Sequence, residues 1–348
     1  MGRGETAGGL RAWVPRWWRG EGGAAGRVLD AVLAPGELLF RSAAMIRNQA
    51  YDHGVLRTAV GSIPVVSVGN LAVGGAGKTP VSAWIAGRLA GWGHRPALVL
   101  RGYGADEILV HRELNPGVPV LAAAHRIEAV QQAVKLGCDV AVVDDGFQHR
   151  ALHRDLDIAL IAADGWESNP RLLPRGPWRE PLSALRRADL AIITRKAAGE
   201  ETARTVERAL APYIAADRIV RCHLAPTRLA GVRGGGTGVE KALVGLRGRK
   251  VLAVASLADP APFAAHLVAA GVEVELAAFG DHHAFTRDEA VELVRRAGSR
   301  PLVMTRKEAV KLRELLPENV EAWMVDQQVE IESGAEVLDE ALRRAVKP

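Results

Sequence analysis

The sequence predicts an α/β protein made of two unequal lobes. From Ile63 onward, short apolar runs of strand length alternate with helical stretches, a pattern typical of a parallel sheet covered on both faces. With 348 residues, the chain has the length of about two domains. Three consecutive glycines from Gly234, followed by a polar stretch, indicate a linker. We therefore expect an N-terminal segment over 1–55, a first domain over 56–233 and a second over 234–348.

Each expected element follows from the spacing of its apolar residues. The strands expected in the first lobe are Pro64–Val68, Ala97–Leu100, Val118–Ala122, Val140–Val143, Ile158–Ala162 and Leu190–Thr194. The helices expected there are Lys78–Trp92, Ile127–Leu136 and Glu201–Tyr213. The second lobe continues the alternation with strands at Val251–Ala255, Val272–Ala277 and Leu302–Met304, and with helices at Pro260–Ala270 and Arg287–Ala297.

The first 55 residues differ in composition from the rest. Tryptophan and arginine are interleaved here, a combination that favours a membrane–water interface, at Trp13, Trp17, Trp18, Arg11, Arg16 and Arg19. A helical pattern follows from Gly36, with one apolar face formed by Leu38, Leu39, Ser42, Met45 and Ile46. This amphipathic segment lies either on a membrane or on the protein's own core. The longest apolar stretch, Val28 to Ile46, is interrupted by charged residues and a proline, so no membrane span and no secretory signal are expected.

Composition and charge exclude several classes of protein. The apolar fraction of 48% rules out a disordered or collagen-like chain. The two cysteines, Cys138 and Cys222, form neither a disulfide framework nor a zinc-site spacing, which fits a reducing cytoplasm. The formal net charge is +5, and 37 of the 45 basic residues are arginines. Arginine suits phosphate and carboxylate partners, although a GC-rich genome explains the excess equally well.

A glycine-rich loop after the first expected strand is the strongest chemical signal. The strand ends near Val68, Gly74, Gly75 and Gly77 follow, and Lys78-Thr79 opens a helix. Glycines allow backbone N–H groups to approach phosphate oxygens, and the helix N-terminus adds a partial positive charge. In a nucleotide-phosphate loop of this kind, Lys78 reaches the β- and γ-phosphates and the Thr79 hydroxyl binds Mg²⁺.

The loop departs from the strict pattern of phosphate loops at one position. That pattern places a glycine where this chain has Ala72. The expected nucleotide-binding residues are Ala72, Val73, Gly74, Gly75, Ala76, Gly77, Lys78 and Thr79.

A pair of aspartates follows another buried strand. Asp144 and Asp145 end the apolar run Val140–Val143, at the strand edge where open α/β sheets bind ligands. A phosphate-loop protein needs a carboxylate there to hold Mg²⁺. Either aspartate satisfies this requirement. Gln148 and His149 follow a tight turn and direct polar groups back to the same edge.

These motifs, with several further ones in the same order, resemble the tetraacyldisaccharide 4′-kinase family. The motifs that carry the resemblance are Val68–Pro80, Arg101-Gly102-Tyr103-Gly104, Asp144–Arg150, Leu173–Glu180, Asp281-His282-His283 and Met304–Leu312. They run from Val65 to Leu312, which is most of the chain. The resemblance implies a larger lobe built like a P-loop NTPase, a smaller α/β lobe and a membrane-associated N-terminal segment.

The resemblance also implies a reaction and roles for particular residues. Family members transfer the γ-phosphoryl group of ATP to the 4′-hydroxyl of an acylated glucosamine disaccharide 1-phosphate, giving lipid IVA in lipid A biosynthesis. By resemblance, Lys78 acts on the phosphates, and Thr79 with Asp144 or Asp145 holds Mg²⁺. Asp106 accepts or orients the hydroxyl proton, with His282 from the second lobe as its partner. Glu180 is a further expected catalytic carboxylate, while Gln148 and His149 contact phosphate or metal ligands.

The family substrate implies a place and partners for the chain. We expect a monomer that acts at the cytoplasmic face of a bacterial inner membrane, on a lipid substrate, without nucleic acid. The sequence departs from the family pattern at Arg306, which reverses a charge, and in the segment Ala255–Pro260. Many family members also have a clear N-terminal membrane helix, in place of which this chain has only the interrupted apolar stretch.

Two alternative functions explain fewer of these features. Another P-loop NTPase that reads guanine needs an Asn-Lys-x-Asp element, and the nearest match, Thr194–Ala197, lacks both the Asn and the Asp. A GTP-dependent metal-delivery protein, one form of this first alternative, also needs a Cys/His cluster, which the two isolated cysteines do not provide. A non-catalytic basic protein that binds nucleic acid or membrane needs a recognition helix or an aromatic basic strand. Neither alternative explains the His282-His283 pair.

Overall fold

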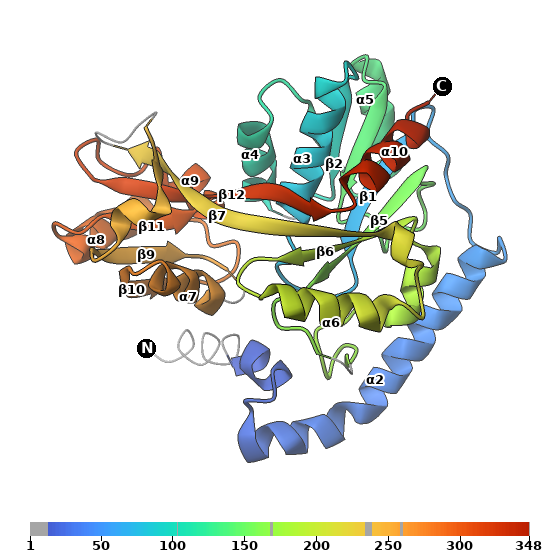
Figure 1. The fold of residues 1–348 in the computed structure, drawn as a ribbon, viewed down its shortest axis with the longest axis horizontal. Coiled ribbons are helices and arrows are strands. Elements are labelled where there is room, and N and C mark those ends of the chain that lie inside the picture. The colour runs from blue at the N-terminus through green and yellow to red at the C-terminus, as the bar shows by residue number, and fades with distance from the viewer. Residues whose placement is uncertain (1–12, 103, 168–169, 234–238, 258–259, 348) are drawn as a thin grey trace. The chain divides into compact units, whose positions relative to one another are not determined.

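The computed structural model describes residues 13–102, 104–167, 170–233, 239–257 and 260–347 (Figure 1). The chain divides into two compact units. The larger unit comprises Arg16–Tyr103, His111–Leu224 and Val329–Pro348, and the smaller one Met1–Pro15, Gly104–Val110 and Ala225–Gln328. The elements α4 (Ala105–Leu114), β7 (Ile219–Arg233) and β12 (Ala322–Ser333) each pass from one unit to the other. The linker expected at Gly234 lies outside the described residues.

The larger unit contains a parallel sheet in the order β7-β6-β5-β1-β4-β2-β3. Its strands, apart from β7, are β1 (Val65–Asn70), β2 (Pro96–Leu100), β3 (Val120–Ala122), β4 (Val140–Asp144), β5 (Leu156–Ala162) and β6 (Leu190–Arg195). Its helices after the N-terminal segment include α3 (Lys78–Gly91), α5 (Arg126–Lys135), α6 (Glu200–Leu210) and α10 (Ala335–Ala345). Burial on both faces explains why these strands are continuous apolar runs rather than alternating ones.

The helices of the larger unit cover both faces of its sheet. Val65 and Ala141 pack with Ala129 and Val130 of α5, while Ala159 packs on the α6 side of the same face. The right-handed crossover from β1 to β2 places α3 on the opposite face. The carboxyl ends of β1 and β4 therefore meet at one edge, with Val68 beside Asp144 in the β1–β4 register.

The smaller unit contains four parallel strands in the order β10-β9-β11-β12. Besides β12, its elements are β9 (Lys250–Ala255), α7 (Ala261–Ala269), β10 (Glu273–Ala278), α8 (Arg287–Ala297), β11 (Leu302–Thr305) and α9 (Arg306–Leu312). The short strand β8 (Glu240–Ala242) pairs antiparallel with β7. The predicted α/β class, with a parallel sheet in the first lobe and a second α/β lobe, is thus confirmed.

Several elements were not expected from the sequence. The strand-and-helix series was predicted to within a few residues, but α4, α9, α10, β7 and β12 were not. The two strands β7 and β12 cross from one unit to the other, so their apolar patterns change along their length. The amphipathic helices α9 and α10 lie beyond the last predicted strand.

The N-terminal helix α2 (Gly23–Asp52) is longer than the sequence suggested. The expected helix began at Gly36, but α2 continues through Pro35, and Figure 1 shows one continuous, bent helix. Proline removes one backbone hydrogen bond and bends a helix without necessarily ending it. No helix among the described residues is long and apolar enough to cross a membrane.

Charged side chains of α2 make many of the contacts between this helix and the rest of the larger unit. Glu37 is 7% exposed and accepts hydrogen bonds from the Leu172 N–H and the Arg175 guanidinium, both at 2.9 Å. Asp30 pairs with Arg171 at 2.7 Å, and Asp52 pairs with Arg150 at 2.6 Å. Of the apolar α2 side chains, Phe40 packs against the core of the larger unit. Carboxylates and their arginine partners thus hold much of the helix.

Large apolar side chains of α2 are exposed. Val28, Val32, Leu39 and Ile46 follow one another at helical spacing and are 63–72% exposed. The alternative that this segment packs its apolar face on the protein's own core is therefore wrong, because Leu38, Leu39, Met45 and Ile46 of that face are 55–72% exposed. The expected interface role also fails for Trp17, which is 5% exposed and donates its indole N–H to the Gly26 carbonyl at 3.1 Å.

The packing of α10 yields a test of the fold. Leu342 of α10 is fully buried, and the helix contacts β1 and β5. We expect Leu342→Ala to lower the free energy of unfolding by about 2–5 kcal/mol, because it leaves a cavity in the core. The exposed Arg344→Ala on the same helix should stay within about 0.5 kcal/mol of the wild type. Denaturation curves that show equal stability for both variants would contradict this packing.

Candidate functional site: a phosphate loop and a His–Asp pair

The phosphate loop of the larger unit joins β1 to α3 and is held by its neighbours. Gly77 caps α3 with φ +82°, a left-handed conformation, and a methyl group there would overlap Leu224. The Val73 N–H donates to the Pro177 carbonyl at 2.7 Å, and the Thr194 hydroxyl donates to the Ala76 carbonyl at 2.9 Å. These contacts with neighbouring protein groups fix the backbone of the loop.

The non-glycine position of the loop has a structural reason. Ala72 forms an antiparallel bridge with Trp178, so its backbone takes part in a short ladder. Such a backbone accepts a residue with a side chain. Within the loop, the glycines with a positive φ angle are Gly74, at +118°, and Gly77. Gly75 accepts a hydrogen bond on its carbonyl from Lys196 Nζ at 3.0 Å.

Two cations converge on Asn70, which ends β1, and on Asp145, which follows β4. Lys78 Nζ donates to Asn70 Oδ1 at 3.2 Å and lies 3.6 Å from Asp145 Oδ1. Arg179 donates to both carboxylate oxygens of Asp145, at 2.9 and 3.1 Å, and also to Asn70. Burial alone would raise the pKa of Asp145, but the Arg179 hydrogen bond and the Lys78 charge outweigh it and lower that pKa.

The two aspartates at the end of β4 have different surroundings. Asp144 is 5% exposed, and its Oδ2 accepts a hydrogen bond from the Thr79 hydroxyl at 3.2 Å. The same oxygen lies 2.9 Å from Nε2 of His111, a fully buried side chain on α4. Asp144 Oδ1 is buried without a hydrogen-bond partner in the described part of the chain.

These surroundings fit Mg²⁺ at Asp144. A buried carboxylate oxygen with a free lone pair, next to a threonine hydroxyl, is a donor set that suits this ion. The described residues contain no cluster of three acidic, histidine or cysteine side chains that could hold a metal. This is expected where phosphates and water supply the remaining ligands.

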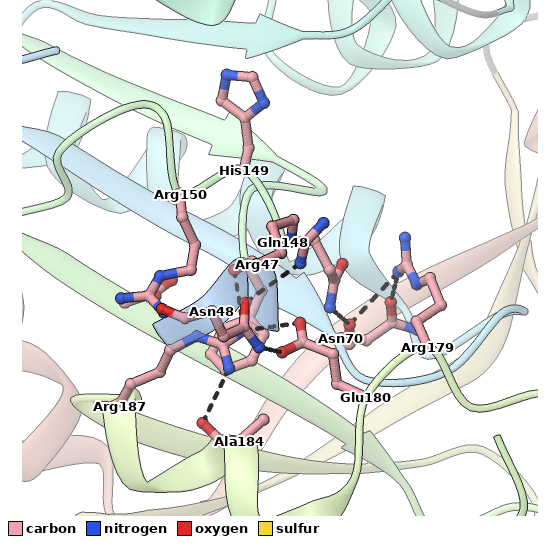
Figure 2. Close-up of polar contacts among 12 residues, drawn as sticks. Arg47, Asn48, Asn70, Gln148, His149, Arg150, Arg179, Glu180, Ala184 and Arg187 are labelled. Carbon is pink, nitrogen blue, oxygen red and sulfur yellow. Dashed lines mark hydrogen bonds and ion pairs between the residues drawn. The ribbon is translucent and has the colours of Figure 1, made fainter. Parts of the chain in front are cut away.

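Gln148 and His149 take different directions after the turn. Gln148 donates to the Asn70 carbonyl at 2.8 Å, so it belongs to the group around Lys78 and Arg179. Figure 2 shows the His149 ring pointing away from Asn70, Arg179 and Glu180. Burial, together with the positive charges of Arg126 and Arg101, lowers the pKa of His149 to about 4. His149 is therefore neutral at pH 7.

Glu180 has the environment of a structural carboxylate. Its side chain is fully buried; Oε2 accepts from Asn48 Nδ2 at 2.8 Å and Oε1 accepts from Arg187 at 2.8 Å (Figure 2). Both oxygens are thus occupied by protein groups. The expected catalytic role of Glu180 does not fit this geometry. The residue ties α2, through Asn48, to the segment that carries Arg179.

A second group of candidate residues lies in the smaller unit. Asp106, in the first turn of α4, is 5% exposed, and His282 Nδ1 lies 3.0 Å from each of its carboxylate oxygens. A methyl group on Gly104 would overlap both side chains, which explains the glycine. The neighbouring His283 instead contacts the Glu289 carboxylate at 3.0 Å and stacks on Phe279.

Backbone strain coincides with these two groups of residues. Among the described non-glycine residues, only Asp145 and His282 have positive φ, at +55° and +56°. This conformation is uncommon for residues with a side chain, costs of the order of 1–3 kcal/mol, and tends to occur at functional sites.

Sequence reasoning missed several residues that the structure places in these groups. Asn70 and Arg179 stood within recognised motifs but were assigned no role, and His111 stood in none. Arg179 directly precedes Glu180, so the motif itself was a usable signal. The contact between His111 and Asp144 joins positions 33 residues apart, and no local pattern announces it. Lys196 belongs to the segment Thr194–Ala197, which lacks the guanine-reading pattern, and its Nζ donates to the Gly75 carbonyl of the phosphate loop.

The larger unit has the site of a P-loop nucleotide-binding protein. Its glycine-rich loop leads into the helix α3, and Thr79 in the first turn of that helix contacts Asp144 at the end of β4, as phosphate and Mg²⁺ binding require. The model of the tetraacyldisaccharide-1-P 4′-kinase family matches residues 29–110 and 105–347. The chain belongs to this family.

Individual relatives agree with the family match. A tetraacyldisaccharide 4′-kinase of Anaeromyxobacter dehalogenans (strain 2CP-C) is 42% identical, over 94% of this chain and 93% of that protein. The enzyme of the same name from Halorhodospira halophila is 33% identical, over 93% of this chain and 94% of its own length. A crystal structure of LpxK from Aquifex aeolicus in complex with ATP superposes with a TM-score of 0.71 at 28% identity, covering 92% of this chain and all of that one.

The phosphate loop yields a second test. We expect Lys78→Ala to weaken ATP binding by about 10- to 100-fold, because it removes a charged hydrogen-bond donor from the phosphates. Isothermal titration with ATP measures the affinity, and circular dichroism checks the fold. Lys135→Ala, at an exposed lysine of α5, is the matched control. Equal affinity in both variants would refute the assignment of the loop.

Proposed function

We propose that this chain is an ATP-dependent kinase that phosphorylates the 4′-hydroxyl of tetraacyldisaccharide 1-phosphate, giving lipid IVA in lipid A biosynthesis. The observation that carries the proposal is the contact of Thr79 with Asp144 beside Lys78, in a chain that belongs to this kinase family. The named relatives support the lipid acceptor, and the ATP complex of the Aquifex structure supports the phosphoryl donor.

The residues of the larger unit account for binding and charge neutralisation. Lys78 and Arg179 supply positive charge for the phosphates, and the backbone of the loop from Gly74 to Gly77 supplies N–H donors. Thr79 and Asp144 would hold Mg²⁺, which neutralises charge on the phosphates when it is bound. Asp145 is already paired with Arg179, so we assign it the orientation of that arginine rather than the metal.

The residues of the smaller unit account for the acceptor. Asp106 is an ionised carboxylate whose partner, His282, lies at hydrogen-bond distance. In the proposed reaction the 4′-oxygen forms a bond to the γ-phosphorus, the bond from that phosphorus to the β–γ bridging oxygen breaks, and ADP leaves. The hydroxyl proton passes to the Asp106–His282 pair. The hydroxyl group loses its proton when it is phosphorylated, and Asp106 is placed to accept that proton. His282 helps by holding the Asp106 carboxylate in a fixed orientation.

The helix α2 accounts for access to a membrane lipid. Its inner side is held by ion pairs, whereas Val28, Val32, Leu39 and Ile46 face outward. Arg27 and Arg47 are also exposed along the helix and can meet lipid phosphates. We therefore place the protein on the cytoplasmic face of the inner membrane, with α2 lying in the interface.

The proposed proton acceptor is tested by Asp106→Ala. We expect kcat for transfer of ³²P from ATP to the acylated disaccharide in mixed micelles to fall by about 10²- to 10⁴-fold. ATP affinity should stay at the wild-type value, because Asp106 lies outside the phosphate loop. Glu107→Ala is the matched comparison. If Glu107→Ala showed the large loss and Asp106→Ala did not, the acceptor role would belong to Glu107.

The proposed membrane contact is tested by a charge on the outer side of α2. We expect Leu39→Glu to reduce cosedimentation with phosphatidylethanolamine–phosphatidylglycerol vesicles several-fold, since a carboxylate resists burial among acyl chains. Val291→Glu, at a residue of α8 that is 57% exposed, should bind the vesicles like the wild type. Unchanged binding of Leu39→Glu would remove α2 from the membrane contact.

A further inference from the structure

A lysine that the proposed mechanism has not used lies next to Asp106. Lys311, on α9, places its Nζ 3.8 Å from Asp106 Oδ2, within the smaller unit. The lysine side chain is only 12% exposed, and that of Asp106 is 4% exposed. Two opposite charges at this distance and this burial interact more strongly than a surface ion pair.

The position of Lys311 is fixed by two hydrogen bonds. Its Nζ donates to the Ser256 hydroxyl at 2.8 Å and to the His283 carbonyl at 3.0 Å. His283 directly follows His282, so the second bond also holds the loop that carries the histidine partner of Asp106. The ammonium group also lies 5.4 Å from the centre of the Phe285 ring, a distance at which cation–π attraction contributes.

Ser256 is in turn fixed by a buried carboxylate. Glu308 is fully buried, and its Oε1 accepts from the Ser256 hydroxyl at 2.7 Å and from the Ser256 N–H at 2.8 Å. Its other oxygen closes the capping box of α9 with Thr305. Hydrogen-bond donation therefore runs from the Lys311 ammonium to the Ser256 hydroxyl, and from that hydroxyl to the Glu308 carboxylate. The Ser256 hydroxyl and the His283 carbonyl both accept hydrogen bonds from the Lys311 ammonium, and acceptors of this kind suit the charged form of a lysine.

Several charges act on Asp106 together. Burial by itself would raise the pKa of Asp106, but the hydrogen bond and charge of His282 and the charges of Lys307 and Lys311 outweigh burial and lower it. Burial also lowers the pKa of Lys311, and the charges of Glu308 and Asp106 only partly oppose that effect. The charged or titratable groups around this pair are His282, Asp281, Lys307, Glu308 and, on α4 itself, Glu107.

We infer that Lys311 is a positioning residue of the acceptor site, which keeps the Asp106–His282 pair free of its proton and holds the His282 loop in place. The inference rests on the proposed function, because it assigns the pair to proton acceptance. A fixed positive charge disfavours addition of a proton to either member of the pair. The inference therefore holds whichever of the two carries the proton. Lys311 touches neither substrate in this account, so its effect is electrostatic and geometric.

The test is the pH profile of kcat/KM for phosphoryl transfer to the acylated disaccharide. In Lys311→Met the acidic limb should move to higher pH by about one unit, because an opposite charge within 4–6 Å typically lowers a carboxyl pKa by one unit or more. Lys311→Arg keeps the charge, so its limb should stay near the wild-type position. Lys250→Met removes an exposed lysine paired with Glu273 in the same unit and serves as the matched control.

The outcomes separate this inference from the proposed function. Thermal melting first establishes that each variant is folded. An unshifted limb in a folded Lys311→Met protein would overturn the role of Lys311 while leaving the kinase assignment intact. Equal shifts in Lys311→Met and Lys311→Arg would also overturn it, because the effect would then come from packing rather than charge. Wild-type transfer by Asp106→Ala would instead overturn the proposed acceptor and the inference with it.

Discussion

The pairing of β1 with β4 is the constraint on which the nucleotide site depends. In this parallel register Val68 lies beside Asp144, so the loop that follows β1 and the aspartates that end β4 emerge at the same edge. A shift of one residue would turn Asp144 to the other face and separate it from Thr79. The register is supported by tight contacts, since a methyl group on Gly69 would overlap Phe147 and one on Gly146 would overlap the Ser67 hydroxyl. Both glycines are therefore required by close packing.

Carboxylates held by hydrogen bonds and ion pairs recur at each candidate site. Asp145 is held by Arg179, Glu180 by Asn48 and Arg187, and Asp106 by His282 and Lys311. Carboxylates removed from water are costly unless they are paired, so the contacts of the buried Glu180 and Asp106 both stabilise these groups and fix their orientation. The surroundings of Asp144 and Asp106 suit different chemical roles. Asp144 retains a buried oxygen without a protein partner, which suits a metal, and Asp106 is ionised beside a histidine, which suits a proton acceptor.

The sequence was most informative where structure is local. The phosphate loop, the Asp144–Asp145 strand end and the alternating elements depend on neighbouring residues, so pattern and spacing found them. A sequence motif also indicated His282, rather than His283, as the partner of Asp106, and in the structure His282 contacts Asp106. What it could not provide was long-range pairing. The contact of His111 with Asp144, and the burial of Glu180 between Asn48 and Arg187, depend on how distant segments pack. For the same reason, the side of α2 that faces inward was not evident from its amphipathic pattern alone.

The central claim is that the chain phosphorylates the distal sugar of an acylated disaccharide, and the position of the new phosphate tests it most directly. The purified full-length protein is incubated with Mg-ATP and tetraacyldisaccharide 1-phosphate in mixed micelles, and the lipid product is examined by fragmentation mass spectrometry and ³¹P NMR. The account predicts one added phosphate, carried as a monoester on the 4′-position of the distal glucosamine, with the 1-phosphate unchanged. A product phosphorylated elsewhere, or ATP hydrolysis without a phosphorylated lipid, would contradict it.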